Sequence, residues 1–266
     1  FMNGVMGIKG GKSVNALAAY GDEVWVGTFS NGIYVYENQT GRTRHYYKTR
    51  RPGTLQNNEV LCIYPDRAGH VWIGTTTDLF LYRRKTDDFE RIEGMRYNCV
   101  VAISEGQGGI LWIATRDNGL KKLEISTKKV RDVLPGNSCK KTSFFCGILS
   151  DVVCGKDGTV WIASGNEGVC RYMPGSGRCD VLNQSDGLPS NSVNKLQESQ
   201  DGGIWACTDR GVSCIGPVDM KVVCSFVENA VLGLLFCTFY TRKFKSFLFP
   251  PAFSYQNLFR AHPYSS

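Results

Sequence analysis

The chain has 266 residues, of which 42% are hydrophobic and 21% are charged, with 30 glycines and 9 prolines. This composition excludes a disordered, collagen-like or low-complexity chain. The net charge of +7 is not concentrated in any run of four or more lysines or arginines, so nucleic-acid binding is not expected.

Along the chain, five similar segments follow one another, and each begins with a short apolar strand. We expect these first strands at 14–17, 60–63, 100–103, 152–154 and 193–196. A turn rich in Asp and Gly separates each of them from a second strand that contains a tryptophan. The tryptophans are Trp25, Trp72, Trp112, Trp161 and Trp205, spaced by 47, 40, 49 and 44 residues.

Two more strands complete each segment. The third strands are expected at 32–36, 79–82, 119–123, 168–172 and 211–215. The fourth lies in a variable stretch, for example at 43–47 or 129–134. A period of roughly 40–45 residues with four antiparallel strands is typical of a β-propeller blade, so the predicted fold class is an all-β propeller.

The second residue after each tryptophan is small, which predicts how neighbouring blades pack. These residues are Gly27, Gly74, Ala114, Ala163 and Cys207. A small side chain is expected where two sheets approach closely, and each tryptophan is expected to fill the gap between its own blade and the next.

The last copy of the repeat resembles a known family most closely. Gly187-Leu188-Pro189-Ser190-Asn191-Ser192-Val193-Asn194 leads into Asp201-Gly202-Gly203-Ile204-Trp205-Ala206-Cys207-Thr208. This pattern resembles the two-component regulator propeller repeat, and five such copies cover residues 13–215. The family forms the extracytoplasmic sensor region of hybrid two-component histidine kinases, many of which detect breakdown products of polysaccharides.

The resemblance implies a role, a location and partners. The role is ligand sensing, with a small saccharide or oligosaccharide as ligand and the signal passed to a kinase that this chain does not contain. The location is the periplasmic or extracytoplasmic part of an inner-membrane sensor protein. The partners are other blades or domains of the parent sensor kinase, and a homodimer is an open possibility because an unclosed arc exposes apolar faces.

The number of repeats bears on ring closure. Members of the family carry enough repeats for seven-bladed rings, so we predict that these five form an incomplete arc of such a ring. The alternative is a closed five-bladed propeller.

The predicted propeller spans residues 1–218, and residues 219–266 form a tail without the repeat. Residues 222–240 are mostly apolar and long enough for a membrane helix, followed by basic residues. Glu228 and Asn229 near the middle of that span are costly in hydrocarbon, which favours the alternative that the tail is sequence read out of register.

Ligand-binding residues are expected in the loops after the tryptophan strands, because propellers bind ligands on that face. The candidates are Asn31, Asp78, Arg116, Asp117, Asn118, Asn166, Glu167, Asp209 and Arg210. Mixed polar groups around one mouth suit hydroxyl-rich or acidic sugars. The alternative is ordinary turn chemistry, which also favours Asn and Asp. Arg116 and Arg210 are the strongest candidates, since a turn does not need a guanidinium and Arg can hold a carboxylate with two hydrogen bonds.

Two other functions remain open: a propeller glycosidase or lyase acting on polysaccharide, and a protein-interaction scaffold. An enzyme would need paired carboxylates or a positioned histidine, and nothing selects such a pair among the loop acids. The three histidines, at 45, 70 and 262, fall outside those loops. We therefore predict a protein that is not an enzyme, without catalytic residues and without a cofactor.

The chain contains 11 cysteines but no C-x-x-C spacing, so no metal site is predicted. Cys170 and Cys179 flank the turn at 173–177 and are expected to face each other across a hairpin.

Overall fold

The computed structural model describes residues 13–134 and 143–227, and within them the strands form five separate four-stranded antiparallel sheets. Each sheet uses four successive strands in chain order, with the first strand at one edge and the fourth at the other. The all-β propeller prediction is therefore confirmed, and each predicted repeat is one blade.

The strands have the following bounds. The first blade contains β1 (Val14–Tyr20), β2 (Glu23–Thr28), β3 (Ile33–Glu37) and β4 (Thr43–Tyr46). The second contains β5 (Val60–Pro65), β6 (Val71–Thr75), β7 (Leu79–Arg83) and β8 (Asp88–Arg91). The third contains β9 (Val100–Glu105), β10 (Ile110–Thr115), β11 (Leu120–Glu124) and β12 (Lys129–Asp132). The fourth contains β13 (Leu149–Cys154), β14 (Val160–Ser164), β15 (Gly168–Met173) and β16 (Arg178–Leu182), preceded by the short helix α2 (Ser143–Cys146). The fifth contains β17 (Val193–Glu198), β18 (Ile204–Thr208), β19 (Gly211–Ile215) and β20 (Val222–Phe226).

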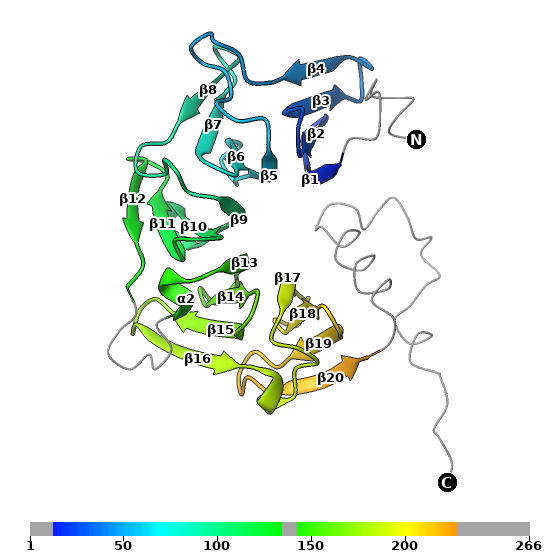
Figure 1. Ribbon diagram of the computed structural model, residues 1–266, viewed down its shortest axis with the longest axis vertical. Coiled ribbons are helices and arrows are strands. Elements are labelled where there is room, and N and C mark those ends of the chain that lie inside the picture. The colour runs from blue at the N-terminus through cyan, green and yellow to red at the C-terminus, as the bar shows by residue number, and fades with distance from the viewer. Residues whose placement is uncertain (1–12, 135–142, 228–266) are drawn as a thin grey trace.

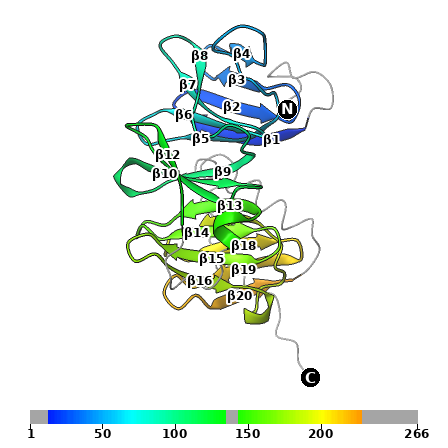
Figure 2. The same ribbon diagram turned by 60° about the vertical axis from the view of Figure 1, so that its left-hand side comes forward.

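The blades are arranged as an open arc. In Figure 1 the first strands β1, β5, β9, β13 and β17 face the inside of the arc, and the fourth strands lie on its outside. Figure 2 shows β1–β8 towards the top, β9, β10 and β12 in the middle, and β13–β16 with β18–β20 towards the bottom. Successive first strands pack side by side from β1 to β17, and within the described residues β17 does not pack against β1 in this way. The predicted open arc is thus confirmed in place of the closed five-bladed ring, and seven blades for the full ring stays a prediction.

The predicted end of the propeller at residue 218 is wrong, because the fifth blade continues to residue 226. After a turn at 216–220 the chain returns as β20, which pairs with β19 so that Val212 lies opposite Phe226. The alternating segment Val222–Phe226 supplies the missing fourth strand because the edge of β19 offers it backbone hydrogen bonds. In the predicted span 222–240, residues 222–226 are therefore strand, and 228–240 lie outside the described residues. No helix in 13–134 or 143–227 is long and apolar enough to cross a membrane.

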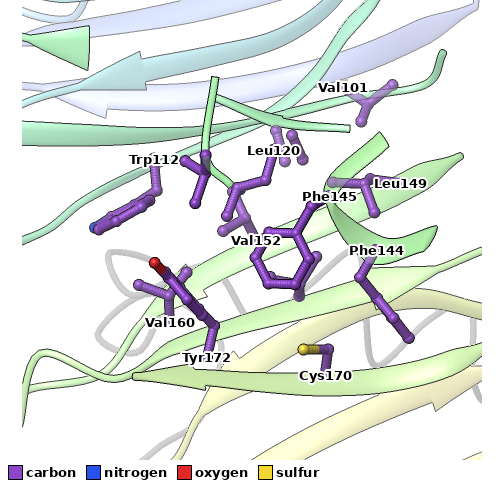
Figure 3. Packing of buried hydrophobic residues seen from close by; sticks show 14 of the residues in the cluster. Val101, Trp112, Leu120, Phe144, Phe145, Leu149, Val152, Val160, Cys170 and Tyr172 are labelled. Carbon is purple, nitrogen blue, oxygen red and sulfur yellow. The ribbon is translucent and has the colours of Figure 1, made fainter. Parts of the chain in front are cut away.

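Four of the five tryptophans, Trp25, Trp72, Trp112 and Trp161, fill the seams between blades, as predicted. Trp25 is completely buried, and its ring lies edge-on to Tyr82 of the second blade with centroids 4.9 Å apart. Figure 3 shows the equivalent seam between the third and fourth blades, where Trp112 and Leu120 face Val160 and Tyr172. Aromatic rings of this size contribute much of the apolar area that each seam buries.

Trp205 differs from the other four tryptophans because it is only half-buried. It belongs to the last described blade, so no following blade of the described chain covers it. Its ring stacks on Phe226 of the same blade, with centroids 6.3 Å apart. The partial exposure of this tryptophan marks the end of the described arc.

The small residues after the tryptophans lie where predicted. A Cβ added to Gly27 would lie 2.5 Å from Cγ1 of Val60 on the next blade. A Cβ added to Gly74 would meet the side chain and the carbonyl oxygen of Val100, also on the next blade. Glycine therefore lets the second strand of one blade approach the first strand of the next.

The prediction that Cys170 and Cys179 face each other across the hairpin is wrong. Cys170 lies opposite Val181, and Cys179 lies opposite Tyr172, because the turn at 173–177 sets the register of β15 and β16. Cys170 is a buried free thiol.

The turns between third and fourth strands share a left-handed position. It is occupied by Gly41, Asp87, Lys128, Gly177 and Met220, all with φ between 54° and 68°. Such a conformation is strained for a residue with a side chain, so the non-glycine residues need a compensating contact. For two of them the contact reaches the preceding blade: Asp87 accepts a hydrogen bond from Tyr46, and Lys128 pairs with Glu90 at 2.6 Å.

Candidate functional site

The candidate site is one face of the arc, which we call the loop face. It consists of the loops from second to third strands (29–32, 76–78, 116–119, 165–167 and 209–210) and the described loops from fourth strands to the next first strands (47–59, 92–99, 143–148 and 183–192). Antiparallel order places both kinds of loop on the same side, since the start of each first strand pairs with the end of its second strand. The other turns lie on the opposite face.

A buried hydroxyl residue ends each second strand and shapes the loop that follows. These residues are Thr28, Thr75, Thr115, Ser164 and Thr208. In four blades the hydroxyl donates to the carbonyl at the far end of the loop, for example from Thr115 to Gly119 at 2.7 Å. In the fourth blade, Ser164 donates to the carbonyl of Ile148 instead. Four of the five loops are therefore closed by a side chain from their own strand.

Backbone hydrogen bonds join these loops within blades and between them. Within a blade, the residue after the hydroxyl donates to the residue just before the first strand, as Arg116 N does to Cys99 O at 2.9 Å. Between blades, Gly32 N donates to Asn58 O and Gly168 N to Asn191 O, both in the loop that leads to the next blade. Such hydrogen bonds make the loop face a connected backbone surface.

Five of the predicted ligand-binding residues take part in turn structure. The backbone N–H groups of Asn31, Asn118 and Asn166 donate to the hydroxyl at the end of the preceding strand, and those of Asp78 and Arg210 do the same. The Asn118 side chain also donates to Asn98, a buried residue of the loop before β9. The structure thus gives these asparagines a structural role on the loop face.

The predicted carboxylates lie in different loops. Asp78 is only 6% exposed, and its carboxylate accepts a hydrogen bond from the Thr77 hydroxyl at 2.6 Å. Asp117 is exposed and accepts a long hydrogen bond of 3.4 Å from Cys99 N. Glu167 is half-buried, and Asp209 is exposed. Each comes from a separate blade.

Arg116 and Arg210 are both exposed on the loop face, on the third and fifth blades. The Arg116 backbone is held by Cys99, and the Arg210 backbone N–H donates to the Thr208 hydroxyl at 3.2 Å. Both guanidinium groups therefore extend from fixed backbone positions into solvent. Turn structure accounts for their backbone positions but not for their guanidinium groups.

Sequence reasoning missed the polar residues of the loop before β5. The Asn57 side chain donates to the Thr76 hydroxyl at 2.6 Å, and that hydroxyl donates to Glu59 at 2.7 Å. The signal for this cluster is the similarity of residues 55–60 to 188–193, which occupy equivalent loops in two blades.

Of the two described histidines, His45 reaches a predicted loop, since its Nε2 lies 2.8 Å from the carbonyl oxygen of Asn31, whereas His70 does not. His70 is on the opposite face, where its Nδ1 lies 2.8 Å from the buried carboxylate of Asp66, which also accepts the Trp72 indole N–H. His45, at the end of β4, stacks on Tyr34 with centroids 4.0 Å apart. In 13–134 and 143–227, no three His, Cys, Asp or Glu side chains are grouped as a metal site would require.

A cluster of residues with shifted pKa values lies on the opposite face, between the first and second blades. Burial and a hydrogen bond to Asp87 raise the pKa of Tyr46 well above its usual range. Burial alone would raise the pKa of Asp87, but hydrogen bonds from Tyr46 and Tyr82 outweigh it and lower that pKa. Arg44 joins the cluster by donating to Tyr82 at 2.8 Å and by pairing with Glu23. These shifts come from a structural junction between two blades.

The fold is a β-propeller arc, and its loop face is built from repeated turns. The family model "Two component regulator propeller" matches residues 54–77 and 187–210, which cover parts of the second and fifth blades. Two segments of the chain therefore match the repeat of the two-component regulator propeller family, in line with the resemblance seen in the sequence.

Several known proteins with a similar sequence or structure are two-component system proteins. Histidine kinase P4 of Formosa agariphila is 28% identical over 184 residues, which cover 64% of this chain and 13% of that protein. The extracellular domain of the hybrid two-component system BT3049 from B. thetaiotaomicron has a TM-score of 0.67 and 26% identity, covering 83% of this chain and 29% of that one. The corresponding domain of BT4673 has a TM-score of 0.72 and 19% identity, covering 86% and 33%.

A bacterial enzyme shares the fold at lower identity. A catalytically inactive variant of virginiamycin B lyase from Staphylococcus aureus has a TM-score of 0.63 and 16% identity, covering 82% of this chain and 70% of that one. At this identity the similarity concerns the fold alone. The chain spans a third or less of the two-component relatives that it matches.

Proposed function

We propose that this chain is part of the extracytoplasmic ligand-sensing propeller of a two-component regulatory protein, and that its loop face binds a saccharide. The matched repeats and the named two-component relatives support the sensor role. The extracellular location given for the structural relatives supports a position outside the cytoplasm.

The observation that carries the saccharide proposal is the pair of exposed guanidinium groups on a fixed loop face. Arg116 and Arg210 extend from backbones that hydrogen bonds hold in place. A guanidinium can form two parallel hydrogen bonds with a carboxylate and can also donate to hydroxyl oxygens. An acidic saccharide that reaches across the fourth blade would satisfy both arginines, while the neighbouring Asp and Asn side chains would accept its hydroxyl protons.

Signal transfer would use the connections between loops. Ligand contacts on one blade reach the next blade through hydrogen bonds such as Gly168 N to Asn191 O. The receiving partners would be further blades or domains of the parent sensor, or a second copy of the chain. Phosphotransfer belongs to a kinase outside this chain.

The test is a glycan array followed by thermal-shift titration on the full 266-residue chain. An acidic oligosaccharide that binds should raise the melting temperature, because a ligand stabilises the state that it binds. Arg116→Ala and Arg210→Ala should each weaken this shift. Arg67→Ala is the matched control, since Arg67 is 73% exposed in a turn on the opposite face.

Two outcomes would contradict the proposal. If Arg67→Ala reduced the shift as much as the loop-face variants, the ligand would bind elsewhere. If a folded chain bound no glycan at all, the protein-interaction scaffold would become the better hypothesis, and its test would be association with other domains of a sensor protein.

A further inference from the structure

Two free thiols face each other across the outer hairpin of the last blade. Cys214 of β19 lies directly opposite Cys224 of β20. Opposed residues in antiparallel strands have Cα atoms about 4.5–5.5 Å apart. A disulfide accepts Cα separations of about 4.4–6.8 Å. The register alone therefore places the two cysteines within bonding distance.

Neighbouring side chains show that these two strands approach closely enough. The hydroxyls of Ser213 and Ser225, the adjacent pair in the register, are 2.7 Å apart. The Cys224 thiol lies near enough to contribute to the raised pKa of Cys214. Both cysteines are half-buried free thiols.

No other free thiol in the described strands lies opposite a second cysteine. Cys62 lies opposite Gly74, and Cys154 lies opposite Val160. Cys170 lies between Ile162 and Val181. Burial raises the pKa of Cys62 to about 12, so it remains a thiol at neutral pH. The pairing is thus a specific property of the last blade.

We propose that Cys214 and Cys224 form a disulfide that fastens β20 to β19 when the chain meets a disulfide donor, such as oxidised glutathione or a disulfide oxidoreductase. One cysteine thiolate attacks the donor and releases its first thiol. The second cysteine thiolate then attacks the mixed disulfide and releases the second. Two electrons and two protons pass from the two cysteines to the donor, which ends as two thiols. Such bonds persist in oxidising compartments.

The disulfide would act where the blade is least supported. Within the described residues, β20 is hydrogen-bonded to β19 alone, as the outer strand of its sheet. Phe226, two residues after Cys224, stacks on the half-buried Trp205. A covalent link between the strands would hold Phe226 over this tryptophan at the open end of the arc.

The rate of closure should depend on pH. The thiolate is the attacking species in both exchange steps. Burial, together with the nearby Cys224, raises the pKa of Cys214 to about 11. Oxidation should therefore become faster as the pH rises from neutral towards that value.

The test uses the full chain, equilibrated with oxidised and reduced glutathione, alkylated and digested with trypsin without reduction. Cleavage after Arg210, Lys221 and Arg242 separates the two cysteines into peptides 211–221 and 222–242. The proposal predicts that these peptides are joined, with a mass lower by two hydrogens than their sum. Amide exchange in 222–226 should be slower in the oxidised chain than in the reduced one.

The variants make the assignment specific. Peptide 222–242 also contains Cys237, so Cys237→Ser should keep the link and Cys224→Ser should abolish it. If both Cys214 and Cys224 remained alkylated after exposure to oxidised glutathione, the proposal would be wrong. It would also be wrong if the link survived in Cys224→Ser or joined two copies of the chain on a non-reducing gel.

Discussion

Replacing Gly74 by alanine tests the packing of one blade against the next. The added Cβ would lie 2.4 Å from Sγ of Cys62, 2.7 Å from Cγ1 of Val100 and 2.9 Å from the Val100 carbonyl oxygen. The side-chain atoms can rotate away, but the carbonyl belongs to the backbone of β9 and can move only with that strand. The substitution therefore forces the second and third blades apart.

The magnitude follows from the cost of overpacking. An extra methyl group in a well-packed core destabilises by about 1–3 kcal/mol. Alanine also restricts the unfolded chain and offsets about 0.4–1 kcal/mol of that loss. A net loss of about 1–2 kcal/mol in the free energy of unfolding corresponds to a melting temperature lower by about 2–8 °C for a domain of this size.

The assay is thermal melting followed by circular dichroism, with two matched variants. In Gly27→Ala the closest contact is the Val60 side chain at 2.5 Å, which can adjust more easily, so the loss should be smaller. In Gly175→Ala no heavy atom lies within 4 Å of the added Cβ, so the melting temperature should not fall. The reasoning is refuted if Gly74→Ala melts together with Gly175→Ala.

Three further substitutions probe the seams and the last described blade. Hydrogen bonds from Tyr46 and Tyr82 outweigh burial and lower the pKa of Asp87 in the folded protein. The ionised Asp87 therefore stabilises the fold fully above the unfolded pKa of about 3.9, and this stabilisation is lost as the pH falls through the folded pKa. Asp87→Asn should therefore lower the melting temperature at pH 7, and its difference from the parent should shrink in a series of melts below about pH 4; a constant difference would contradict this. Trp25→Ala should cost about 3–5 kcal/mol in a urea titration, because Trp25 is fully buried. Trp205→Ala should lower the free energy of unfolding by clearly less. Equal losses for the two variants would mean that another part of the protein covers Trp205.

Much of the fold could be predicted because a blade repeats its physical constraints. Each seam needs a large ring and a small residue two positions later, so Trp72 with Gly74 and Trp161 with Ala163 recur at equivalent places. The fourth strand of the last blade was missed because an apolar run such as 222–226 fits both an outer strand and the start of a membrane helix. Only its pairing with β19 distinguishes the two.

The site was harder to predict because loop residues serve two purposes at once. Asn31 and Asn118 are polar residues in the right loops, but the structure uses their backbones to close turns on Thr28 and Thr115. The cluster around Asn57 depends on contacts between loops distant in sequence, which spacing along the chain does not show. Arg116 and Arg210 could be singled out because their chemistry exceeds what a turn requires.

The contacts of the 3–4 turns make the order of the blades chemically specific. At the first seam a cation, Arg44, meets the acid Asp87 of the following turn at 3.5 Å. At the second seam the signs are reversed, since the acid Glu90 meets Lys128. Placing the third blade directly after the first would bring Arg44 against Lys128, two like charges. Blades that share one ancestral pattern have therefore become non-interchangeable neighbours, and duplicating or shuffling them would require the charges on both sides of the new junction to change together.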